Sequence, residues 1–245
     1  MSLATEKKDL AEPDNRLFPN TKLYCDGRPR SSLRGWFHFF ACITFFPMLL
    51  TNYIYIFYNS DKTAINWLSF AACITNFLFI YVAHCISAFY HIWDLNLNNE
   101  ILLQRMDIIG ANMYIASSYL PMALLFPTNI GILLIILATI LVGWNIFGIL
   151  NSSYSLHQPV YICLLLIVFG YYIYKFLTSA EYILLYTGIF SLAIGYICLF
   201  YEIDAPFNID PAFFSHFEIY HGFSLICLSS ICLMNYSIFK RTFIL

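Results

Sequence analysis

Five side chains that can bind a metal ion or move a proton lie at the ends of long apolar stretches. These residues are Ser87, His91, Asp107, His216 and His221. Zinc in proteins is held by imidazole nitrogen and carboxylate oxygen, and a catalytic zinc ion keeps one position for a water molecule. Bound zinc lowers the pKa of that water to about 7, which makes a nucleophile at neutral pH. The residue types therefore predict a zinc site, provided that the fold brings them together.

The five residues divide into metal ligands and residues that assist a reaction. His91, His216 and His221 are the predicted zinc ligands. Asp107 would hold the water or take its proton, and Ser87 would donate a hydrogen bond to the developing oxyanion. Each histidine taken alone is more often a hydrogen-bonded residue between helices, so only their agreement in position favours a shared site. The alternative for the same residues is a structural zinc ion that pins helices together.

The elements that must position these residues are membrane-spanning helices. Of the 245 residues, 60% are hydrophobic and 11% are charged, against about 45–50% and about 25% in soluble domains. A helix needs about 20 apolar residues to cross a bilayer, and continuous apolar runs favour helices over the alternating strands of a membrane barrel. The sequence thus predicts an all-α bundle of seven transmembrane helices, at Trp36–Tyr58, Ile65–Phe89, Ile108–Phe126, Ile130–Leu150, Val160–Leu177, Tyr182–Tyr201 and Phe217–Phe239.

The chain divides into a polar N-terminal tail, residues 1–34, which we expect to be flexible, and one transmembrane domain, residues 35–245. Seven of the twelve lysines and arginines precede the first apolar stretch. Because basic residues stay on the cytoplasmic side, the N-terminus of this integral, multi-pass protein is predicted to be cytoplasmic and the C-terminus to lie on the opposite side. Lys240 and Arg241 oppose this orientation weakly.

Alternating helix directions determine which polar residues can meet. In an up-and-down bundle, the ends of even-numbered helices and the starts of odd-numbered helices share one face of the membrane. All five residues lie at such positions, so we expect them at one depth. His84 lies seven residues before His91 and about 10 Å deeper, at 1.5 Å per residue, which predicts a buried hydrogen-bonding role. His38 is expected to lie at the membrane interface.

Charge and cysteine usage exclude other classes of function. The formal net charge is -2, and no broad basic face argues for nucleic acid. None of the eight cysteines forms a CxxC pair, which argues against a zinc ribbon or a disulfide framework. The expected partners are membrane lipids, including a lipid-like substrate.

Four segments of the chain resemble one family of membrane proteins. They are RPRSSLRGWFHFFA, CISAFYH, LLQRMDIIGANMYIASSYLPMALL and DPAFFSHFEIYHGFSLI, spread over about residues 27 to 230. These motifs are similar to those of the haemolysin III branch of the progestin and adipoQ receptor family, within a wider group that includes alkaline ceramidases and GPI-anchor lipid-remodelling hydrolases. The resemblance implies a seven-helix bundle in which three histidines hold zinc near a serine and an aspartate.

One position departs from the family pattern. The last family motif is HExxH, whereas this chain has Phe217 in place of the first histidine and has His216 one position earlier. On an α-helix, residues four apart differ in direction by about 40° and residues five apart by about 140°. A π-turn at the start of this helix would bring His216 onto the face of His221. Without such a turn, His91 and His221 remain as ligands.

The residues and the resemblance together predict a zinc-dependent hydrolase of a ceramide-like lipid amide. The alternative is a non-enzymatic pore-forming (haemolytic) or receptor-like membrane protein with a structural or vestigial metal site. A pore needs polar residues along one helix face through the whole membrane, and the fourth to sixth predicted helices carry very few.

Overall fold

The structure is a computed structural model that describes Tyr24 and residues 32–61, 63–93, 97–123, 128–150, 176–201 and 216–244. Every regular element in these residues is a helix, which confirms the predicted all-α class for this part of the chain. Among the same residues, four segments are long and apolar enough to cross a membrane: Gly35–Tyr58, Asn66–Ile92, Ser179–Cys198 and Glu218–Arg241.

The helices follow the predicted apolar stretches. They are α1 (Ser32–Phe40), the π-helix η1 (Ala41–Phe45), α2 (Phe46–Tyr58), α3 (Ala64–Ile92), α4 (Leu97–Ser117), α5 (Tyr119–Ala123), α6 (Thr128–Leu150), α8 (Ser179–Phe200) and α9 (His216–Ile244). Helical structure thus lies at six of the predicted positions. The fifth predicted span, Val160–Leu177, lies outside the described residues apart from its last two positions, and so does the predicted tail apart from Tyr24 and the first residues of α1.

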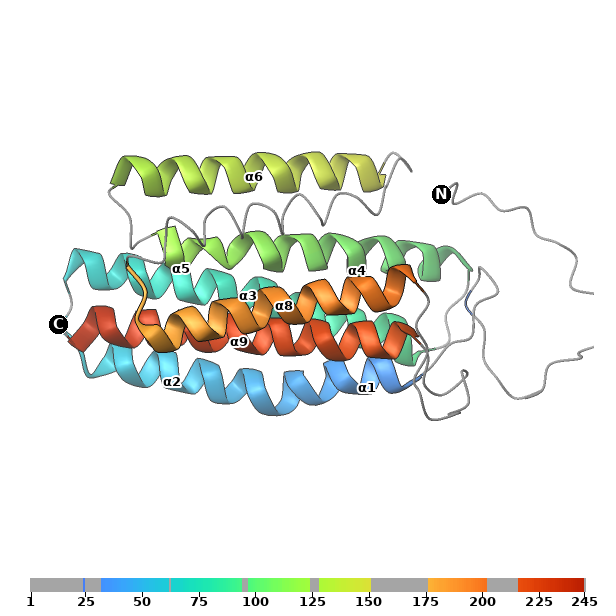
Figure 1. Ribbon diagram of the computed structural model, residues 1–245, viewed down its shortest axis with the longest axis horizontal. Coiled ribbons are helices and arrows are strands. Elements are labelled where there is room, and N and C mark those ends of the chain that lie inside the picture. Colours follow the sequence, from blue (N-terminus) through green and yellow to red (C-terminus); the bar gives the residue numbers. More distant parts are fainter. Residues whose placement is uncertain are drawn as a thin grey trace, which may run out of the picture.

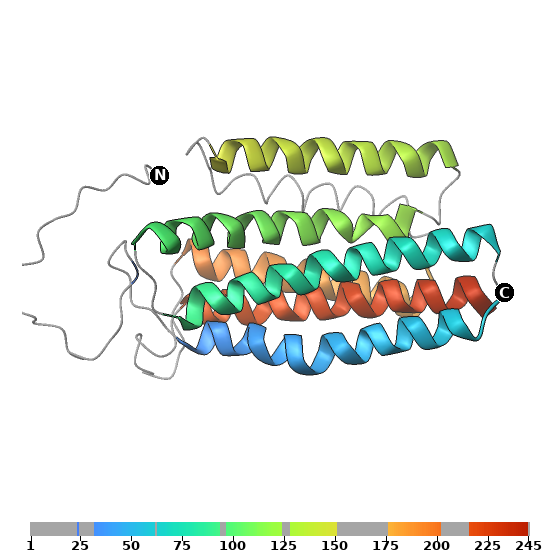
Figure 2. The same ribbon diagram turned by 180° about the vertical axis from the view of Figure 1, so that it is seen from behind.

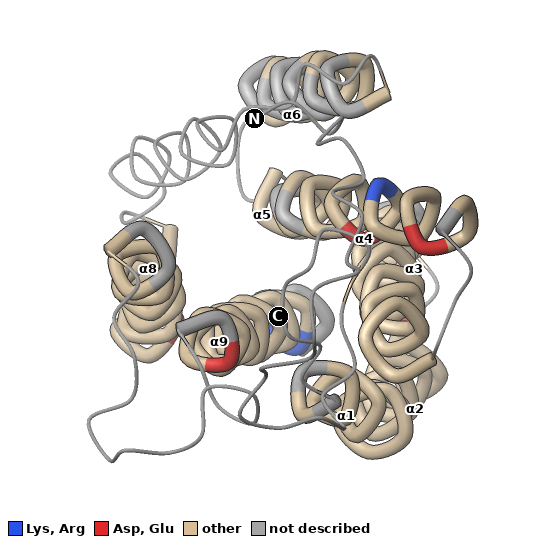
Figure 3. Tube along the Cα trace, turned by 90° about the vertical axis from the view of Figure 1, so that its right-hand side faces the viewer, with Lys and Arg blue, Asp and Glu red and all other residues tan. Residues whose placement is uncertain are grey.

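The helices run side by side along the long axis of the molecule (Figure 1). The start of α1, the end of α3 and the starts of α4 and α9 all lie at the same end of the bundle, and the view from behind agrees (Figure 2). This arrangement has the alternating helix directions expected from the sequence. Seen end-on, the described helices carry few charged residues (Figure 3).

Apolar side chains form both the interior and the outer surface. Phe46, Leu185 and Met234 are completely buried in the core. Large apolar residues such as Ile54, Trp144 and Phe147 are exposed on the outside. Because a bilayer solvates apolar side chains, an outer surface of this kind is suited to lipid rather than to water.

The continuous helical segment formed by α1, η1 and α2 contains a π-helical turn. The π-helix η1 separates α1 from α2, and Pro47 stands in the first turn of α2. Proline has no N–H group, so the regular hydrogen bond to the carbonyl four residues earlier cannot form here. Single π-turns often occur at functional sites, and this one directly follows the turn that carries His38.

The helix α4 differs from the prediction at its start. It begins at Leu97, whereas the predicted span begins at Ile108, so Asp107 does not lie at the start of its helix, where the sequence placed it. The apolar stretch marks where a helix meets the membrane, and not where the helix itself begins. Residues around Glu100 and Arg105 therefore extend the same helix beyond the apolar stretch.

A buried cluster of amide and hydroxyl groups joins α3, α9 and the break between α4 and α5. Asn76 donates to the Ser117 hydroxyl at 2.9 Å, and Asn235 donates to the Asn76 side-chain oxygen at 3.3 Å and to the Ser118 carbonyl at 3.4 Å. The break has a local cause, because Pro121 cannot donate a backbone hydrogen bond to Ser117. Buried polar groups need such partners, so this cluster fixes how the three elements pack.

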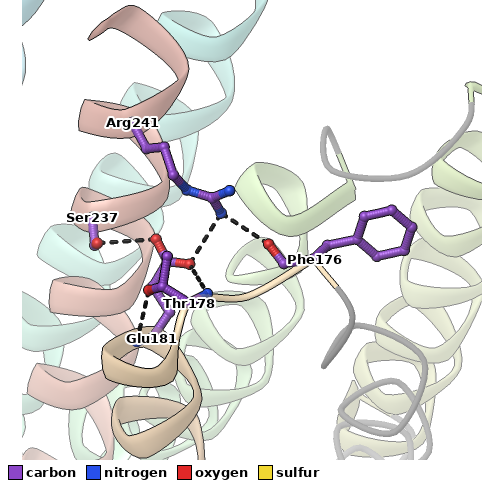
Figure 4. Close-up of polar contacts among 5 residues, drawn as sticks. All are labelled: Phe176, Thr178, Glu181, Ser237 and Arg241. Atoms are coloured by element: carbon purple, nitrogen blue, oxygen red, sulfur yellow. Dashed lines mark hydrogen bonds and ion pairs between the residues drawn. The ribbon is translucent and has the colours of Figure 1, made fainter. Parts of the chain in front are cut away.

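A second polar cluster joins the start of α8 to the end of α9 (Figure 4). Glu181 is completely buried and accepts hydrogen bonds from the backbone N–H of Thr178 at 2.9 Å and from Ser237 at 2.9 Å. Arg241 forms an ion pair with the same carboxylate at 3.0 Å and also donates to the carbonyl of Phe176 at 3.0 Å. The buried charge is therefore paired, as a charge in an apolar environment must be.

Replacing Arg241 with methionine should lower the free energy of unfolding by about 1–3 kcal/mol, because it leaves the buried Glu181 carboxylate without its charged partner. The change is measured as a lower melting temperature in detergent. Lys240→Met is the matched control, because Lys240 is exposed on the same turn of α9 and its loss removes the same charge. Equal melting temperatures for the two variants would contradict this account of the cluster.

Candidate metal centre

Three of the predicted site residues come together at one end of the bundle, from three different helices. Nε2 of His91, in the last turn of α3, lies 3.9 Å from Oδ2 of Asp107 on α4. The ring centroids of His91 and His221, which is on α9, are 5.2 Å apart. Two imidazoles on one tetrahedral zinc ion have centroids about 5 Å apart, given bonds of about 2.0–2.1 Å. The spacing of His91 and His221 is therefore suitable for a shared metal ion.

The fourth predicted residue, Ser87, lies one turn before His91 on α3 and is buried. Its hydroxyl forms a hydrogen bond with Asp107. Burial raises the pKa of Asp107 to about 6, while the hydrogen bond from Ser87 opposes this shift. The Asp107 side chain keeps 21% of its surface exposed, against 4% for His91. A carboxylate with these properties is accessible from one side and can exchange a proton near neutral pH.

The side chain of the fifth residue, His216, lies outside the described residues, and so does that of Phe217. The backbone of α9 is a regular α-helix from His216 onward, so the π-turn considered for this helix is not present there. Positions 216 and 221 consequently lie about 140° apart around the helix axis. His216 as a zinc ligand stays a prediction.

The sequence analysis missed His38 as a member of this cluster. We expected His38 at the membrane interface, but the structure buries it, with 6% of its surface exposed. Its Nε2 atom lies 3.2 Å from Nδ1 of His221, and its ring centroid is 5.3 Å from that of His221 and 6.2 Å from that of His91. The start of the first helix shares the membrane face of the other four residues, so the same topological rule would have found it.

Two further residues support the histidines. The hydroxyl of Tyr24 hydrogen-bonds to Nδ1 of His91, and the Tyr24 ring stacks on Tyr90 with centroids 5.2 Å apart. His84 is buried, as predicted, and its Nδ1 atom lies 3.1 Å from the carbonyl of Ile80. Sequence reasoning also missed Tyr24, because nothing in the polar segment around it indicates a contact with the bundle.

The donor set fits zinc by chemistry and by the spacing of its closest rings. Imidazoles from α1, α3 and α9 lie with centroids 5.2 to 6.2 Å apart, and a carboxylate lies 3.9 Å from one of them. In the described part of the chain, however, no three His, Cys, Asp or Glu side chains are arranged closely enough to form an assembled metal site. The wider separation of His38 and His91 agrees with this result.

A bundle of apolar helices with histidines and a carboxylate at one end defines a class, the integral membrane proteins with a polar site where helices terminate. Within this class, the model of the haemolysin-III related family matches residues 28–232, and the chain belongs to that family. The matched range contains every residue of the cluster except Tyr24. A search of curated proteins finds no match.

Proposed function

We propose that this haemolysin III-family protein is a zinc-dependent hydrolase that cleaves an amide bond of a membrane lipid. The observation that carries the proposal is the placement of His91, Asp107 and His221 together at one end of an apolar bundle. Zinc bound there would lower the pKa of a water molecule to about 7 and make it a nucleophile.

The chain's own residues have distinct roles in this proposal. His91 and His221 hold the metal, with His216 as the third ligand predicted from the sequence. Asp107 accepts the proton of the attacking water at a carboxylate oxygen. Ser87 is a single hydroxyl donor, so it holds Asp107 before the reaction. Once Asp107 carries a proton, the Ser87 hydroxyl can turn to the oxyanion that forms on the substrate carbonyl.

The surface around the site supports a lipid substrate. Phe40, Phe89, Trp93 and Met106 are exposed and come from the helices that carry the site residues or from the turn after α3. Exposed apolar side chains of this kind are suited to contact with the acyl chain of a lipid, whose amide group would meet the partly exposed Asp107 carboxylate. Aromatic residues such as Trp93 also favour the boundary between lipid and water, which is where a lipid amide group is found.

The proposal includes a bundle of seven transmembrane helices with a cytoplasmic N-terminus. In its support, α1 begins and α9 ends at opposite ends of the bundle (Figure 1). Arg241 near the C-terminus opposed this orientation by its charge. Its ion pair with the buried Glu181 offsets that charge, which weakens the objection.

The test is a measurement of zinc and of lipid amide hydrolysis on the full chain purified in detergent. We expect one zinc ion per chain, and release of fatty acid from a ceramide-like amide that stops when a chelator removes the metal. A protein that contains no metal, or that keeps zinc but hydrolyses no lipid amide, would contradict the proposal. If the protein keeps zinc but hydrolyses no lipid amide, a melting temperature that rises when zinc binds would indicate a structural metal ion. Steady conductance across pure liposomes would indicate a pore.

A further inference from the structure

We propose that His38 is the third imidazole ligand of the metal centre, in place of the residue at position 217, and that His84 orients it. This inference rests on the proposed zinc site. It goes beyond that site because it assigns the third ligand position to α1, a helix that the ligand set predicted from the sequence does not include. The contacts that carry it lie between α1, α3 and α9.

Two ring nitrogens of His38 and His221 lie at a distance that suits a shared metal ion. Nε2 of His38 and Nδ1 of His221 are 3.2 Å apart. Two nitrogens bonded to one tetrahedral zinc ion lie about 3.3–3.4 Å apart, given bonds of about 2.0–2.1 Å. A direct hydrogen bond between two neutral imidazoles has nearly the same length, so the distance permits a shared metal, and metal binding further requires a lone pair on Nε2 of His38.

The hydrogen bond of His84 indicates which nitrogen of His38 carries the proton. The carbonyl of Ile80 can only accept, so Nδ1 of His84 must donate to it, and Nε2 of a neutral His84 is then an acceptor. Nε2 of His84 and Nδ1 of His38 are both buried without a hydrogen-bond partner among the described residues, and the two rings are 4.9 Å apart. The two rings are close enough for a ring rotation to bring these two atoms together, which would satisfy both.

The paired arrangement prepares His38 to bind a metal. With its proton on Nδ1 and donated to His84, His38 keeps a lone pair on Nε2, the atom that faces His221. Metal-binding histidines almost always donate their second ring N–H to another group, which fixes the tautomer and the ring direction. His84 therefore acts as a positioning residue and is not itself a ligand. His91 has the corresponding support, because its Nδ1 atom is hydrogen-bonded to Tyr24.

The helix α1 packs closely against α3, and this approach brings His38 to the site. A Cβ atom added to Gly35 would lie 2.3 Å from Cγ1 of Ile92 and 3.1 Å from Cβ of His91. Only glycine allows the two helices to pack this closely. His38 follows one turn later on the same helix, so the close packing at Gly35 helps to hold it near His91. The π-helix that begins at Ala41 then changes the direction of the following residues without moving His38.

The alternative ligand, His216, is less well placed. The α-helical backbone of α9 puts position 216 about 140° from position 221 around the helix axis. The ring of His38 already lies close to two of the predicted ligands, because its centroid is 5.3 Å from that of His221 and 6.2 Å from that of His91. The first distance is close to the spacing of about 5 Å expected for two imidazoles on one zinc ion, and the second is clearly larger.

The test compares zinc content in wild type, His38→Ala and His216→Ala, each as the full chain purified in detergent. We expect one zinc ion per chain in the wild type and in His216→Ala, and a background level in His38→Ala. Elution volume and the melting temperature in the presence of chelator show whether each variant is folded. His84→Phe should still bind zinc, but about 10–100-fold more weakly, as expected for the loss of a group that supports a ligand.

The outcomes separate this inference from the proposed function. Zinc retained in His38→Ala overturns the assignment of His38, and zinc lost from both alanine variants overturns it too, because His216 would then be a ligand. In either case the proposed zinc site stands. A wild-type protein that contains no zinc overturns the proposed function, and the assignment of His38 fails with it.

A second variant tests ligation directly, even if His38→Ala is unstable. His38→Cys places a thiolate, another zinc ligand, at the same position. Loaded with Co²⁺ in place of zinc, this variant should show a sulfur-to-cobalt charge-transfer absorption in the near ultraviolet that is missing from the wild type. A residue with a merely structural role would not produce this band, so its absence from folded, cobalt-loaded His38→Cys overturns the assignment.

Discussion

Replacing Asp107 with asparagine is expected to lower lipid amide hydrolysis by about 10²–10⁴-fold, the usual contribution of a positioned general base, while zinc stays bound. The variant keeps the shape of the side chain and its ability to accept a hydrogen bond from Ser87. It cannot accept a proton from the attacking water. The measurement is the initial rate of fatty acid release from a ceramide-like substrate at saturating zinc, together with the zinc content of the same sample.

The matched control for this prediction is Asp61→Asn. Asp61 is exposed in the turn between α2 and α3, at the other end of the bundle from Asp107. The Asp61→Asn variant should hydrolyse the substrate at the wild-type rate. Full activity in Asp107→Asn would show that Asp107 takes no part in the reaction. Loss of zinc from this variant would show instead that Asp107 holds the metal.

The sequence was informative about the membrane class and about which helix ends meet. Continuous apolar stretches give the positions of membrane helices because a bilayer requires about 20 apolar residues of each, and helices are found at those positions throughout the described residues. Alternating helix direction then places His91, Asp107 and His221 at one end, where the structure brings them within a few ångströms of one another.

Features that depend on close packing were not predictable from apolar stretches. The start of α4 at Leu97 lies in a polar segment, and the approach of α1 to α3 depends on the absence of a single Cβ atom at Gly35. Tyr24 reaches His91 from a segment that has no apolar pattern. Each of these features is decided by tertiary contacts, which a count of apolar residues along the chain does not contain.

The departure at Phe217 was recognised from the sequence, and a compensating ligand was sought within the same helix, at His216. A π-turn was considered for the start of α9, which is α-helical. Among the described residues, the π-helix η1 lies instead between α1 and α2, directly after the turn of His38. Sequence spacing compares residues within one helix. A replacement ligand from another helix becomes visible only when the distances between helices are known.

Replacing His91 with alanine is expected to lower the affinity for zinc by more than 100-fold, because loss of a supporting group alone costs about 10–100-fold. His91 is the residue that the other parts of the site share. Its ring lies 5.2 Å from that of His221, and its Nε2 atom lies 3.9 Å from Asp107. The dissociation constant is measured by competition with a chromophoric chelator, on protein in detergent.

Tyr24→Phe is the graded comparison for His91→Ala. It keeps the aromatic ring that stacks on Tyr90 and removes only the hydroxyl that hydrogen-bonds to Nδ1 of His91. Affinity for zinc should therefore fall by about 10–100-fold, less than in His91→Ala, with an unchanged number of zinc ions bound at saturation. Equal affinities for wild type and Tyr24→Phe would mean that Tyr24 does not orient the ligand. Unchanged affinity in His91→Ala would place the metal elsewhere, because no other residue joins α3 to both Asp107 and His221 among the contacts described for this cluster.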